Sequence, residues 1–427
     1  MATAFRLDQS FALQMDSQDP LAAYRDRFYI PQTETGEDCI YLCGNSLGLQ
    51  PKTAAIYVEQ ILKDWELLGV EAHFRAGHPW ITYHELLTES IARLVGAKPI
   101  EVVVMNALTV NLHLMMVSFY RPTSQRHKIL IEANAFPSDQ YAVKSQLAFH
   151  GFDPDTSLIE ISPRPGERII RIEDIESLIA REGDSIALIM LAGVQYATGQ
   201  AFEMARIVRA GHAKGCVVGF DLAHAVGNVI LQLHDWDVDF AVWCSYKYLN
   251  GGPGSPAGCF VHERYANDPA LPRLAGWWGH DKPTRFLMGP VFHPIPGAEG
   301  WQVSNQPILS LAALRAAMEI FDEVGIEKIR AKSVLLTGYL DFLLERHPHE
   351  DFSIITPRQP EHRGAQLSIS IRKHGRALCE KLSGLGVICD WREPDILRVA
   401  PVPLYNSFLE VYRFVEIFNQ VLSGKDT

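Results

Sequence analysis

The chain has 427 residues, of which 47% are hydrophobic and 21% charged, and its formal net charge is −11. This length and composition predict about two domains with a large buried core. The chain contains no Lys/Arg-rich block and no apolar run of about 18 residues, which argues against a nucleic-acid-binding protein and against a membrane protein. Its start is too polar for a signal peptide. The seven scattered cysteines, none in a CxxC pair, favour reduced thiols in a cytoplasmic protein and argue against a metal site.

The N-terminal part of the chain is predicted to be mainly helical. The Asp-Pro pair at 19–20 is typical of a helix start, because Asp caps the first turn and proline suits the first helical position. Helices are predicted over residues 19–27, 51–68 and 80–95. His73 lies in the loop between the last two helices, where a histidine is more often a surface or packing residue than a ligand.

Two turns in the first third of the chain are candidate ligand contacts. The sequence GNSLG at 44–48 is either a plain turn or a place where backbone amides and the Ser46 hydroxyl meet a ligand carboxylate. The strand predicted at 101–105 is followed by Leu108 and Thr109, which open an apolar helix. Thr109 is either a simple helix cap or part of an anion site at the helix N-terminus.

The middle of the chain alternates between strands and helices. The strand at 128–133 is followed by FPSD at 136–139, where Ser138 is suited to begin a helix. Further strands are predicted at 157–161, 186–192, 216–221, 239–244 and 257–262, and further helices at about 171–182 and 202–214. Strands separated by helices predict a mostly parallel sheet with helices on both faces.

Two of these strands end in residues that are suited to chemistry. Asp221 ends one strand, with His224 just after it, and SYK at 245–247 ends the next, before a loop rich in Gly and Pro. Ligands bind at this edge of α/β sheets. An amine among apolar groups is a nucleophile, and a fixed carboxylate can hold a protonated pyridine nitrogen. The pair therefore predicts a pyridoxal phosphate (PLP) site with Lys247 as the Schiff-base lysine. Taken singly, Asp221 is more often a helix cap and Lys247 a solvated loop residue.

The last third of the chain carries an irregular segment and a smaller lobe. Residues 271–300 are rich in Gly and Pro and include Trp277 and Trp278, and long segments without regular structure are often functional. Helices are predicted at 309–324, 327–346, 375–383 and 407–422, and strands at 353–357, 366–371, 387–391 and 396–400. Arg398, in the last strand, suits a bidentate contact to a carboxylate, although a strand-edge salt bridge is the commoner role.

Several segments, taken together, resemble the kynureninase family, and they span nearly the whole chain. They are YLCGNSLGLQP (41–51), VMNALTVNLH (104–113), EANAFPSDQYA (132–142), DLAHAVGN (221–228), SYKYLNGGPG (245–254), GWWGH (276–280), SNQPILS (304–310) and RVAPVPLYNSF (398–408). The resemblance implies an α/β fold, that of the PLP-dependent transferases of fold type I. It places a mostly parallel seven-stranded sheet in a large domain at 51–310 and an α+β C-terminal domain at 311–427, with residues 1–50 packing on the small domain and the active site.

The activity that the resemblance implies is hydrolysis of the Cβ–Cγ bond of L-kynurenine or L-3-hydroxykynurenine to L-alanine and an anthranilate, in tryptophan catabolism or NAD biosynthesis. Lys247 is then expected to hold PLP and move the α-proton, Asp221 to hold the pyridine nitrogen and Tyr246 to donate a proton. The expected cofactor-binding residues are Leu108, Thr109, Phe136, Pro137, Ser138, Asp139, Asp221, His224, Tyr246, Lys247, Trp277 and Asn305. The expected substrate-binding residues are Ser46, His73, Trp278, Ser304, Asn305 and Arg398.

The resemblance also implies a homodimer in which segment 271–300 lies at the interface and each subunit completes the other's site. His73, Ser304 and Asn305 offer polar contacts to the substrate's aromatic ring, which favours 3-hydroxykynurenine because a site built to bond a hydroxyl rejects the analogue that lacks it.

Two other interpretations compete with this one. A cysteine desulfurase of the same wider group would need a mobile, reactive cysteine, and segment 271–300 contains none. A PLP-binding fold kept as a regulatory protein would be favoured by loss of Lys247 or Asp221, and both are present.

Overall fold

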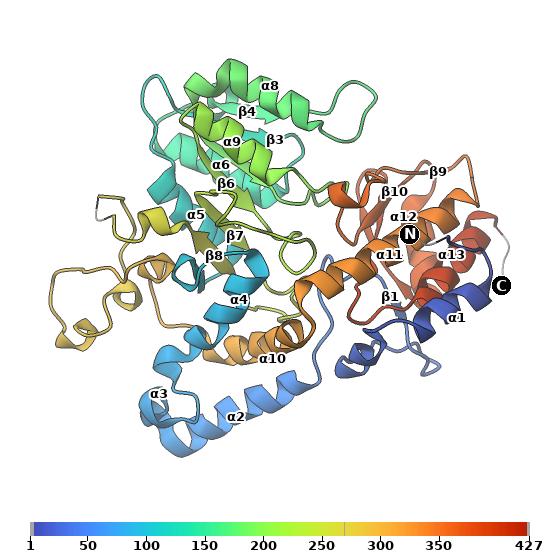
Figure 1. Cartoon of the computed structure of the whole chain (residues 1–427), viewed down its shortest axis with the longest axis horizontal. Coiled ribbons are helices and arrows are strands. Elements are labelled where there is room, and N and C mark those ends of the chain that lie inside the picture. Colours follow the sequence, from blue (N-terminus) through green and yellow to red (C-terminus); the bar gives the residue numbers. More distant parts are fainter. Residues whose placement is uncertain (1–3, 269, 425–427) are drawn as a thin grey trace.

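The computed structural model describes residues 4–268 and 270–424, and a seven-stranded sheet forms its centre (Figure 1). The strands are β2 (Val102–Val104), β3 (Lys128–Glu132), β4 (Leu158–Ile161), β5 (Ile186–Ala192), β6 (Val217–Asp221), β7 (Phe240–Trp243) and β8 (Gly258–Val261). Their order across the sheet is β2-β8-β7-β6-β5-β3-β4. Only β8 runs antiparallel to its neighbours, so the predicted mostly parallel sheet is confirmed.

Helices cover both faces of this sheet because its strands are apolar on both sides. On β3, Ile129 packs with α5 (Leu108–Phe119) and α6 (Pro137–Phe149), whereas the next residue, Leu130, belongs to the cluster on the opposite face. That second cluster includes α4 (Thr88–Val95), α8 (Ile172–Glu182), α9 (Met204–Ala213) and α10 (Ile308–Val324). The side chains thus alternate between faces with the period of two that a strand imposes.

The C-terminal part forms the smaller lobe at the right of Figure 1. Its antiparallel sheet has the order β12-β13-β10-β9, built from β9 (Phe352–Ile354), β10 (Leu367–Ile371), β12 (Asp390–Arg392) and β13 (Ile396–Val399). The helices of the lobe are α11 (Ile326–Glu345), α12 (Gly375–Gly384) and α13 (Phe408–Leu422). The N-terminal segment joins this lobe, because β1 (Ile40–Tyr41) pairs in parallel with β11 (Val387–Ile388) and α1 (Gln9–Ser17) contacts α13.

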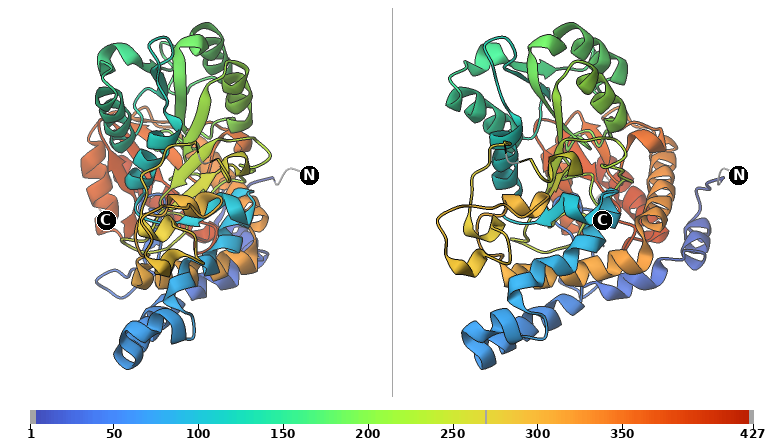
Figure 2. Two further views of the ribbon diagram at one scale, coloured as in Figure 1. Left: turned by 90° about the vertical axis from the view of Figure 1, so that its left-hand side faces the viewer. Right: turned by 60° about the vertical axis from the view of Figure 1, so that its left-hand side comes forward.

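The remaining helices and turns link the two parts. The long helices α2 (Thr53–Leu68) and α10 pack side by side below the sheet in Figures 1 and 2. The short helices are α3 (Ala72–Arg75), α7 (Pro154–Ser157), and the 3₁₀ turns Gly69–Glu71, Pro99–Glu101, Gly183–Ser185, Glu263–Tyr265 and Pro360–His362. In the part of the chain that the structure describes, no helix is long and apolar enough to cross a bilayer.

Three of the predicted elements are wrong in type or extent. The helix predicted at 19–27 is a 3₁₀ helix over Ala22–Arg27, because Asp19 accepts the N–H of Leu21 at 2.9 Å and holds a tight turn, and the first helix is α1 instead. The helix predicted at 80–95 begins as 3₁₀ (Trp80–Leu87). The strand predicted at 387–391 is divided between two sheets as β11 and β12.

Segment 271–300 has no strand and contains only short 3₁₀ turns, at Trp277–Gly279, Arg285–Leu287 and Ala298–Trp301. It extends from the body of the molecule at the left of Figure 1. The segment is therefore as irregular as its Gly and Pro content indicates.

Candidate active site

The candidate site lies at the carboxyl edge of the parallel strands. Asp221 is the last residue of β6 and pairs in register with Ala192, the last residue of β5, and with Val242 of β7. Glu132 ends β3, and Lys247 follows β7. Because parallel strands end at one edge, residues distant in sequence meet there.

One pocket at this edge collects most of the predicted cofactor-binding residues. Its lining consists of Leu108, Thr109, Glu132, Phe136, Ser138, Asp139, Ala192, Val194, Tyr196, Asp221, Ala223, His224, Tyr246 and Lys247. Pro137 is the first residue of α6, between Phe136 and Ser138. The strand ends and the starts of α5 and α6 therefore build the pocket together.

Lys247 projects into the pocket between a histidine and aromatic rings. Its Nζ lies 3.0 Å from Nε2 of His224 and 5.8 Å from the centre of the Phe136 ring. Burial, and then the charge of Lys247, hold the pKa of His224 well below its usual range, so its imidazole is neutral. Because Lys247 donates to Nε2, the imidazole proton sits on Nδ1, which has no hydrogen-bond partner among the described residues.

Three buried carboxyl groups line the same pocket. Burial raises the pKa of Glu132 to about 7, although its carboxylate accepts the N–H of Ala192 at 3.2 Å. Burial and the charge of Asp221 hold the pKa of Asp139 well above its usual range. Asp221 accepts the N–H of Ala223 at 2.7 Å, and burial raises its pKa. Asp139 is thus the protonated member of its pair with Asp221.

The start of α5 adds an anion-binding element to the pocket. Its N-cap, Ala107, has no side-chain oxygen to cap the first turn, and Leu108 and Thr109 line the cavity. The N-terminus of a twelve-residue helix offers backbone N–H groups and the positive end of its dipole. An anion such as a phosphate is the natural partner of this turn.

Arg398 contacts the backbone of Tyr196, a residue that lines the pocket. Its Nη1 donates to the carbonyl of Tyr196 at 3.0 Å, its Nη2 to the hydroxyl of Ser46 at 2.8 Å and its Nε to Asp390 at 2.6 Å. The side chain is buried, and Asp390 also receives Arg392 at 3.0 Å. The predicted Ser46 and Arg398 are therefore in contact, within the small lobe and next to the pocket.

The structure does not bring the other predicted residues into this pocket. The His73 ring packs 5.3 Å from that of Trp80, and Trp277 donates its indole N–H to the carbonyl of Arg285. The buried Trp278 lies under the guanidinium of Arg285. Ser304 and Asn305 are exposed just before α10. All five lie in or beside α3 and segment 271–300.

Three residues next to the site were missed by the sequence interpretation. Glu132 and Tyr196 line the pocket, and Asp390 holds Arg398. Glu132 belongs to a motif already selected, EANAFPSD, and its position at a strand end was a usable signal. Neither Tyr196 nor Asp390 lies in a sequence pattern that would mark it as a site residue.

The residues of this pocket fit PLP by their chemistry. Asp221, the ionised member of its pair with Asp139, could hold a cationic pyridine nitrogen. The buried Asp139 Oδ1 and His224 Nδ1 have no partner within the described chain, so a polar ring could satisfy them. Phe136 offers a stacking face, the start of α5 a phosphate site and Lys247 an amine.

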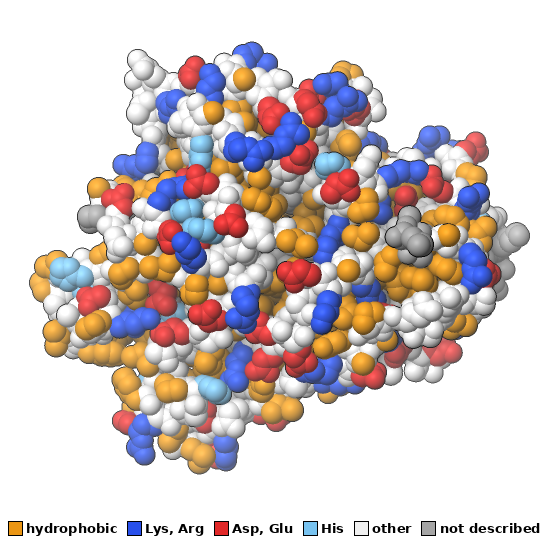
Figure 3. Space-filling model, in the orientation of Figure 1, with side chains coloured by type: hydrophobic (Ala, Val, Ile, Leu, Met, Phe, Trp, Pro, Cys, Tyr) orange, Lys and Arg blue, Asp and Glu red, His pale blue; other side chains and the backbone are white. Residues whose placement is uncertain are grey.

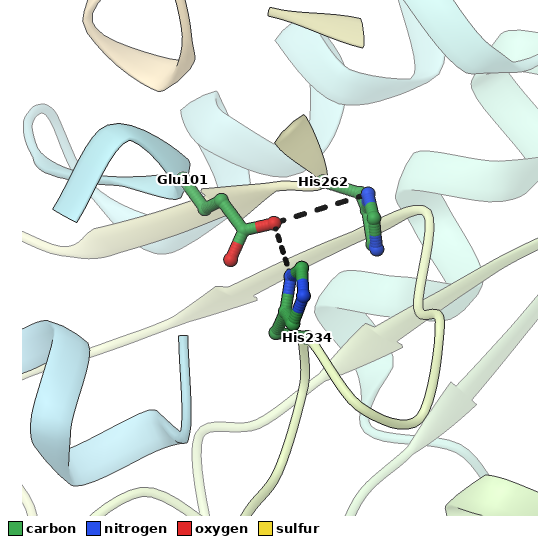
Figure 4. A group of neighbouring side chains, drawn as sticks. All are labelled: Glu101, His234 and His262. Atoms are coloured by element: carbon green, nitrogen blue, oxygen red, sulfur yellow. Dashed lines mark hydrogen bonds and ion pairs between the residues drawn. The ribbon is translucent and has the colours of Figure 1, made fainter. Parts of the chain in front are cut away.

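A second titratable group lies at the opposite edge of the sheet (Figure 4). The fully buried Glu101 accepts hydrogen bonds from His234 Nδ1 at 2.9 Å and from the N–H groups of Lys98 and Glu263 at 2.8 Å. His262 Nδ1 accepts the N–H of Arg264, so its lone pair is already used. Hydrogen bonding within the chain accounts for this cluster.

Comparisons with known proteins agree with this geometry. A family model described as aminotransferase class-V matches residues 40–264, and one described as the kynureninase C-terminal domain matches residues 329–418. The chain is 66% identical to a kynureninase of Koribacter versatilis, over 98% of both chains, and 60% identical to one of Myxococcus xanthus, over 96% of this chain and 97% of the relative.

Solved structures show the same fold at low sequence identity. The cysteine desulfurase CsdA of Escherichia coli has a TM-score of 0.76 at 16% identity, covering 94% of this chain and 98% of that one. The apo cysteine desulfurase of Thermococcus onnurineus has a TM-score of 0.75 at 15% identity, covering 99% and 100%. The fold is therefore that of the PLP-dependent fold type I enzymes. The similarity to curated kynureninases over nearly the whole chain shows that this chain belongs to the kynureninase family of PLP-dependent enzymes.

Proposed function

We propose that the pocket around Lys247 hydrolyses the Cβ–Cγ bond of L-kynurenine or L-3-hydroxykynurenine, releasing L-alanine and the corresponding anthranilate. The observation that carries the proposal is the contact of Lys247 Nζ with the neutral His224, in a pocket that also holds the carboxyl groups of Glu132, Asp139 and Asp221. The chain is a kynureninase in family, and this site contains the residue types that the reaction needs.

PLP supplies an aldehyde for an amine and a ring that accepts electrons from the substrate's Cα. In our proposal Lys247 would hold the cofactor through Nζ, and its amine would also carry the Cα proton. Asp221 would keep the ring nitrogen protonated, and Asp139 would support it as the neutral partner of Asp221. Thr109 and the amides at the start of α5 would bind the phosphate, and Phe136 would offer a stacking face to the ring.

Tyr246 is the proposed proton donor. Burial, and then the neighbouring Cys244, raise the pKa of its phenol far above neutrality, so the group carries its proton at physiological pH. It lies next to Lys247 and lines the pocket. A protonated phenol can deliver a proton to the carbon atom left when the aroyl group departs.

Arg398 and Ser46 are the proposed anchors for the substrate's α-carboxylate. Arg398 is fixed by Asp390, Ser46 and the Tyr196 carbonyl, and this fixed fork can orient the carboxylate. Fixing the carboxylate orients the bonds at Cα relative to the cofactor ring.

A homodimer is the proposed assembly, and its interface is an exposed apolar surface. The surface consists of Leu62, Trp65, Val70, Phe74, Trp277, Phe286, Leu287, Met288 and Val291. Phe74 and Phe286 join its two parts, since their ring centres are 6.0 Å apart. Orange side chains gather over the lower left of Figure 3, where α2, α3 and segment 271–300 lie in Figure 1. Large exposed apolar surfaces of this kind mark interaction sites.

The dimer would also explain the residues that one chain leaves outside the pocket. His73, Trp277, Ser304 and Asn305 lie in or beside the segments that carry this apolar surface, so a second copy would present them to the site of the first, whereas Trp278 is buried within its own chain. Their polar groups favour 3-hydroxykynurenine over kynurenine. We further propose that the chain divides into an N-terminal segment (1–50), a large domain (51–310) and a small domain (311–427). The pairing of β1 with β11 supports the placement of the N-terminal segment on the small domain. The seven free cysteines support a cytoplasmic location.

The test offers both substrates separately to the PLP-loaded protein and measures anthranilate, 3-hydroxyanthranilate and alanine. Lys247→Ala is expected to lose turnover and, after borohydride reduction, the pyridoxyl mass on the peptide that contains residue 247. Lys52→Ala, at an exposed lysine, is the matched control and is expected to keep both. Failure of the wild-type protein to form either anthranilate would reject the activity, and a preference for kynurenine would reject only the assignment of the ring-hydroxyl contacts.

A further inference from the structure

Two cysteines of the small lobe lie close together outside the active site. Cys379, on α12, and Cys389, between β11 and β12, place their Sγ atoms 4.0 Å apart. Both are partly exposed, whereas the other five cysteines are buried. Their mutual contact lowers the pKa of Cys379, which makes its thiol the first of the two to ionise.

Cys389 is connected through the backbone to the residues around Arg398. The next residue, Asp390, forms an ion pair with Arg398 and accepts a hydrogen bond from Ser46. On its other side, β11 pairs with β1, and the chain continues from β1 to Ser46. A displacement of Cys389 toward α12 would therefore act directly on the side chains that hold Arg398.

We propose that Cys379 and Cys389 are an oxidisable dithiol, and that closing it to a disulfide weakens substrate binding. The effect on binding rests on the proposed function, in which Arg398 anchors the carboxylate. Closure must bring the sulfurs from 4.0 Å to about 2.05 Å. Cys389 lies in a one-residue gap between two strands and Cys379 within a helix, so the link moves Cys389 and, with it, Asp390.

The oxidant is a small-molecule disulfide. The Cys379 thiolate attacks one of its sulfurs, which forms a mixed disulfide and releases one thiol. The Cys389 thiolate then attacks Cys379 Sγ, forms the intramolecular S–S bond and releases the second thiol. The two protein thiols lose two protons and two electrons, and these appear in the two thiols released.

The experiment treats PLP-loaded enzyme with oxidised glutathione and combines mass spectrometry with steady-state kinetics. We expect a mass loss of two hydrogens, a cross-linked peptide joining residues 379 and 389, and an increase in KM of about tenfold with kcat changed less than about twofold, all reversed by dithiothreitol; a tenfold change corresponds to about 1.4 kcal/mol. Cys379→Ser and Cys389→Ser should each abolish the cross-link and the KM change, while Cys216→Ser, at a buried cysteine, should keep both.

The outcomes separate this inference from the proposed function. The cross-link is measured without turnover, so its absence under oxidation overturns the dithiol whatever the enzyme's substrate. A complete cross-link with unchanged KM overturns the coupling to Arg398. Reduced enzyme that cleaves neither substrate rejects the proposed function and leaves the cross-link measurement intact.

Discussion

Lys247 Nζ lies 3.0 Å from Nε2 of His224, and the two residues come from segments that follow neighbouring strands, β7 and β6. The contact joins the predicted Schiff-base lysine to an imidazole that burial keeps neutral. His224 thereby accepts a hydrogen bond from Lys247, and its buried Nδ1 has no partner among the described residues. We propose that His224 orients the amine of Lys247.

We expect His224→Leu to weaken PLP binding about tenfold, the equivalent of about 1.4 kcal/mol for one lost hydrogen bond to a charged group. PLP fluorescence titration of the apoenzyme measures the change. His224→Asn can still accept a hydrogen bond and should retain more of the affinity. Equal affinity in His224→Leu and the wild type would show that the contact does not serve the cofactor.

Asp221 and Asp139 should respond differently to the same substitution. Asp221→Asn removes the charge that would hold the ring nitrogen protonated, and we expect kcat to fall at least about 100-fold, the equivalent of about 2.7 kcal/mol. Asp139 is already protonated, because burial and Asp221 raise its pKa, so Asp139→Asn should lower kcat less than about tenfold. Steady-state kinetics at pH 8 show which variant loses more kcat. A larger loss in Asp139→Asn would mean that Asp139, and not Asp221, carries the charge next to the ring nitrogen.

Arg398→Lys should raise KM more than it lowers kcat. Lysine keeps the positive charge but lacks the planar fork that contacts Asp390, Ser46 and the Tyr196 carbonyl. We expect an increase in KM of about tenfold or more. Arg392→Lys, at a half-exposed arginine that also contacts Asp390, is the matched control and should change KM less than about threefold. Equal effects at both positions would remove Arg398 from the substrate site.

A stability prediction concerns His212 and Asp239, which lie 2.9 Å apart at the sheet edge opposite the pocket. The hydrogen bond that His212 donates to Asp239 raises the pKa of His212. The stability from this pair is therefore full below the unfolded-state pKa of about 6.5 and is lost as pH rises through the folded-state pKa. His212→Asn should therefore cost about 1 kcal/mol at pH 5.5 and clearly less at pH 9. Denaturant unfolding at both pH values measures it, with the exposed His347→Asn as control; a pH-independent cost contradicts the charge assignment.

The proposed interface predicts that one charge on the apolar surface disrupts assembly. Leu287 is 76% exposed, so Leu287→Asp should not unfold the chain. It should shift dimers toward monomers, and it should lower activity because each monomer would lack the residues that its partner contributes to the site. Sedimentation at several concentrations, with kinetics at the same concentrations, tests both effects. Leu385→Asp, at an exposed leucine of the small lobe, should leave the assembly unchanged.

The sheet and the edge that carries Asp221 and Lys247 could be predicted from local sequence patterns alone. Apolar runs, most of them separated by predicted helices, gave the bounds of β3, β5, β6 and β7 to within one or two residues. A strand that is buried on both faces must be apolar along its length. Asp221 and Lys247 were recognisable because they follow such strands directly, and parallel strands end at one edge.

Contacts between residues that are distant in the sequence could not be predicted in this way. Asp390 holds Arg398 because β12 and β13 pair with these two residues opposite each other, and Arg398 reaches the Tyr196 carbonyl because the small lobe packs against the large one. No local pattern encodes such contacts. The pairing of Cys379 with Cys389 likewise depends on how α12 packs beside the short strands. The 3₁₀ turn after Asp19 replaced the predicted helix because side-chain hydrogen bonding outweighed weak local propensity. The spacing of apolar residues predicts which side of each segment is buried, whereas the partner of each side chain depends on long-range packing.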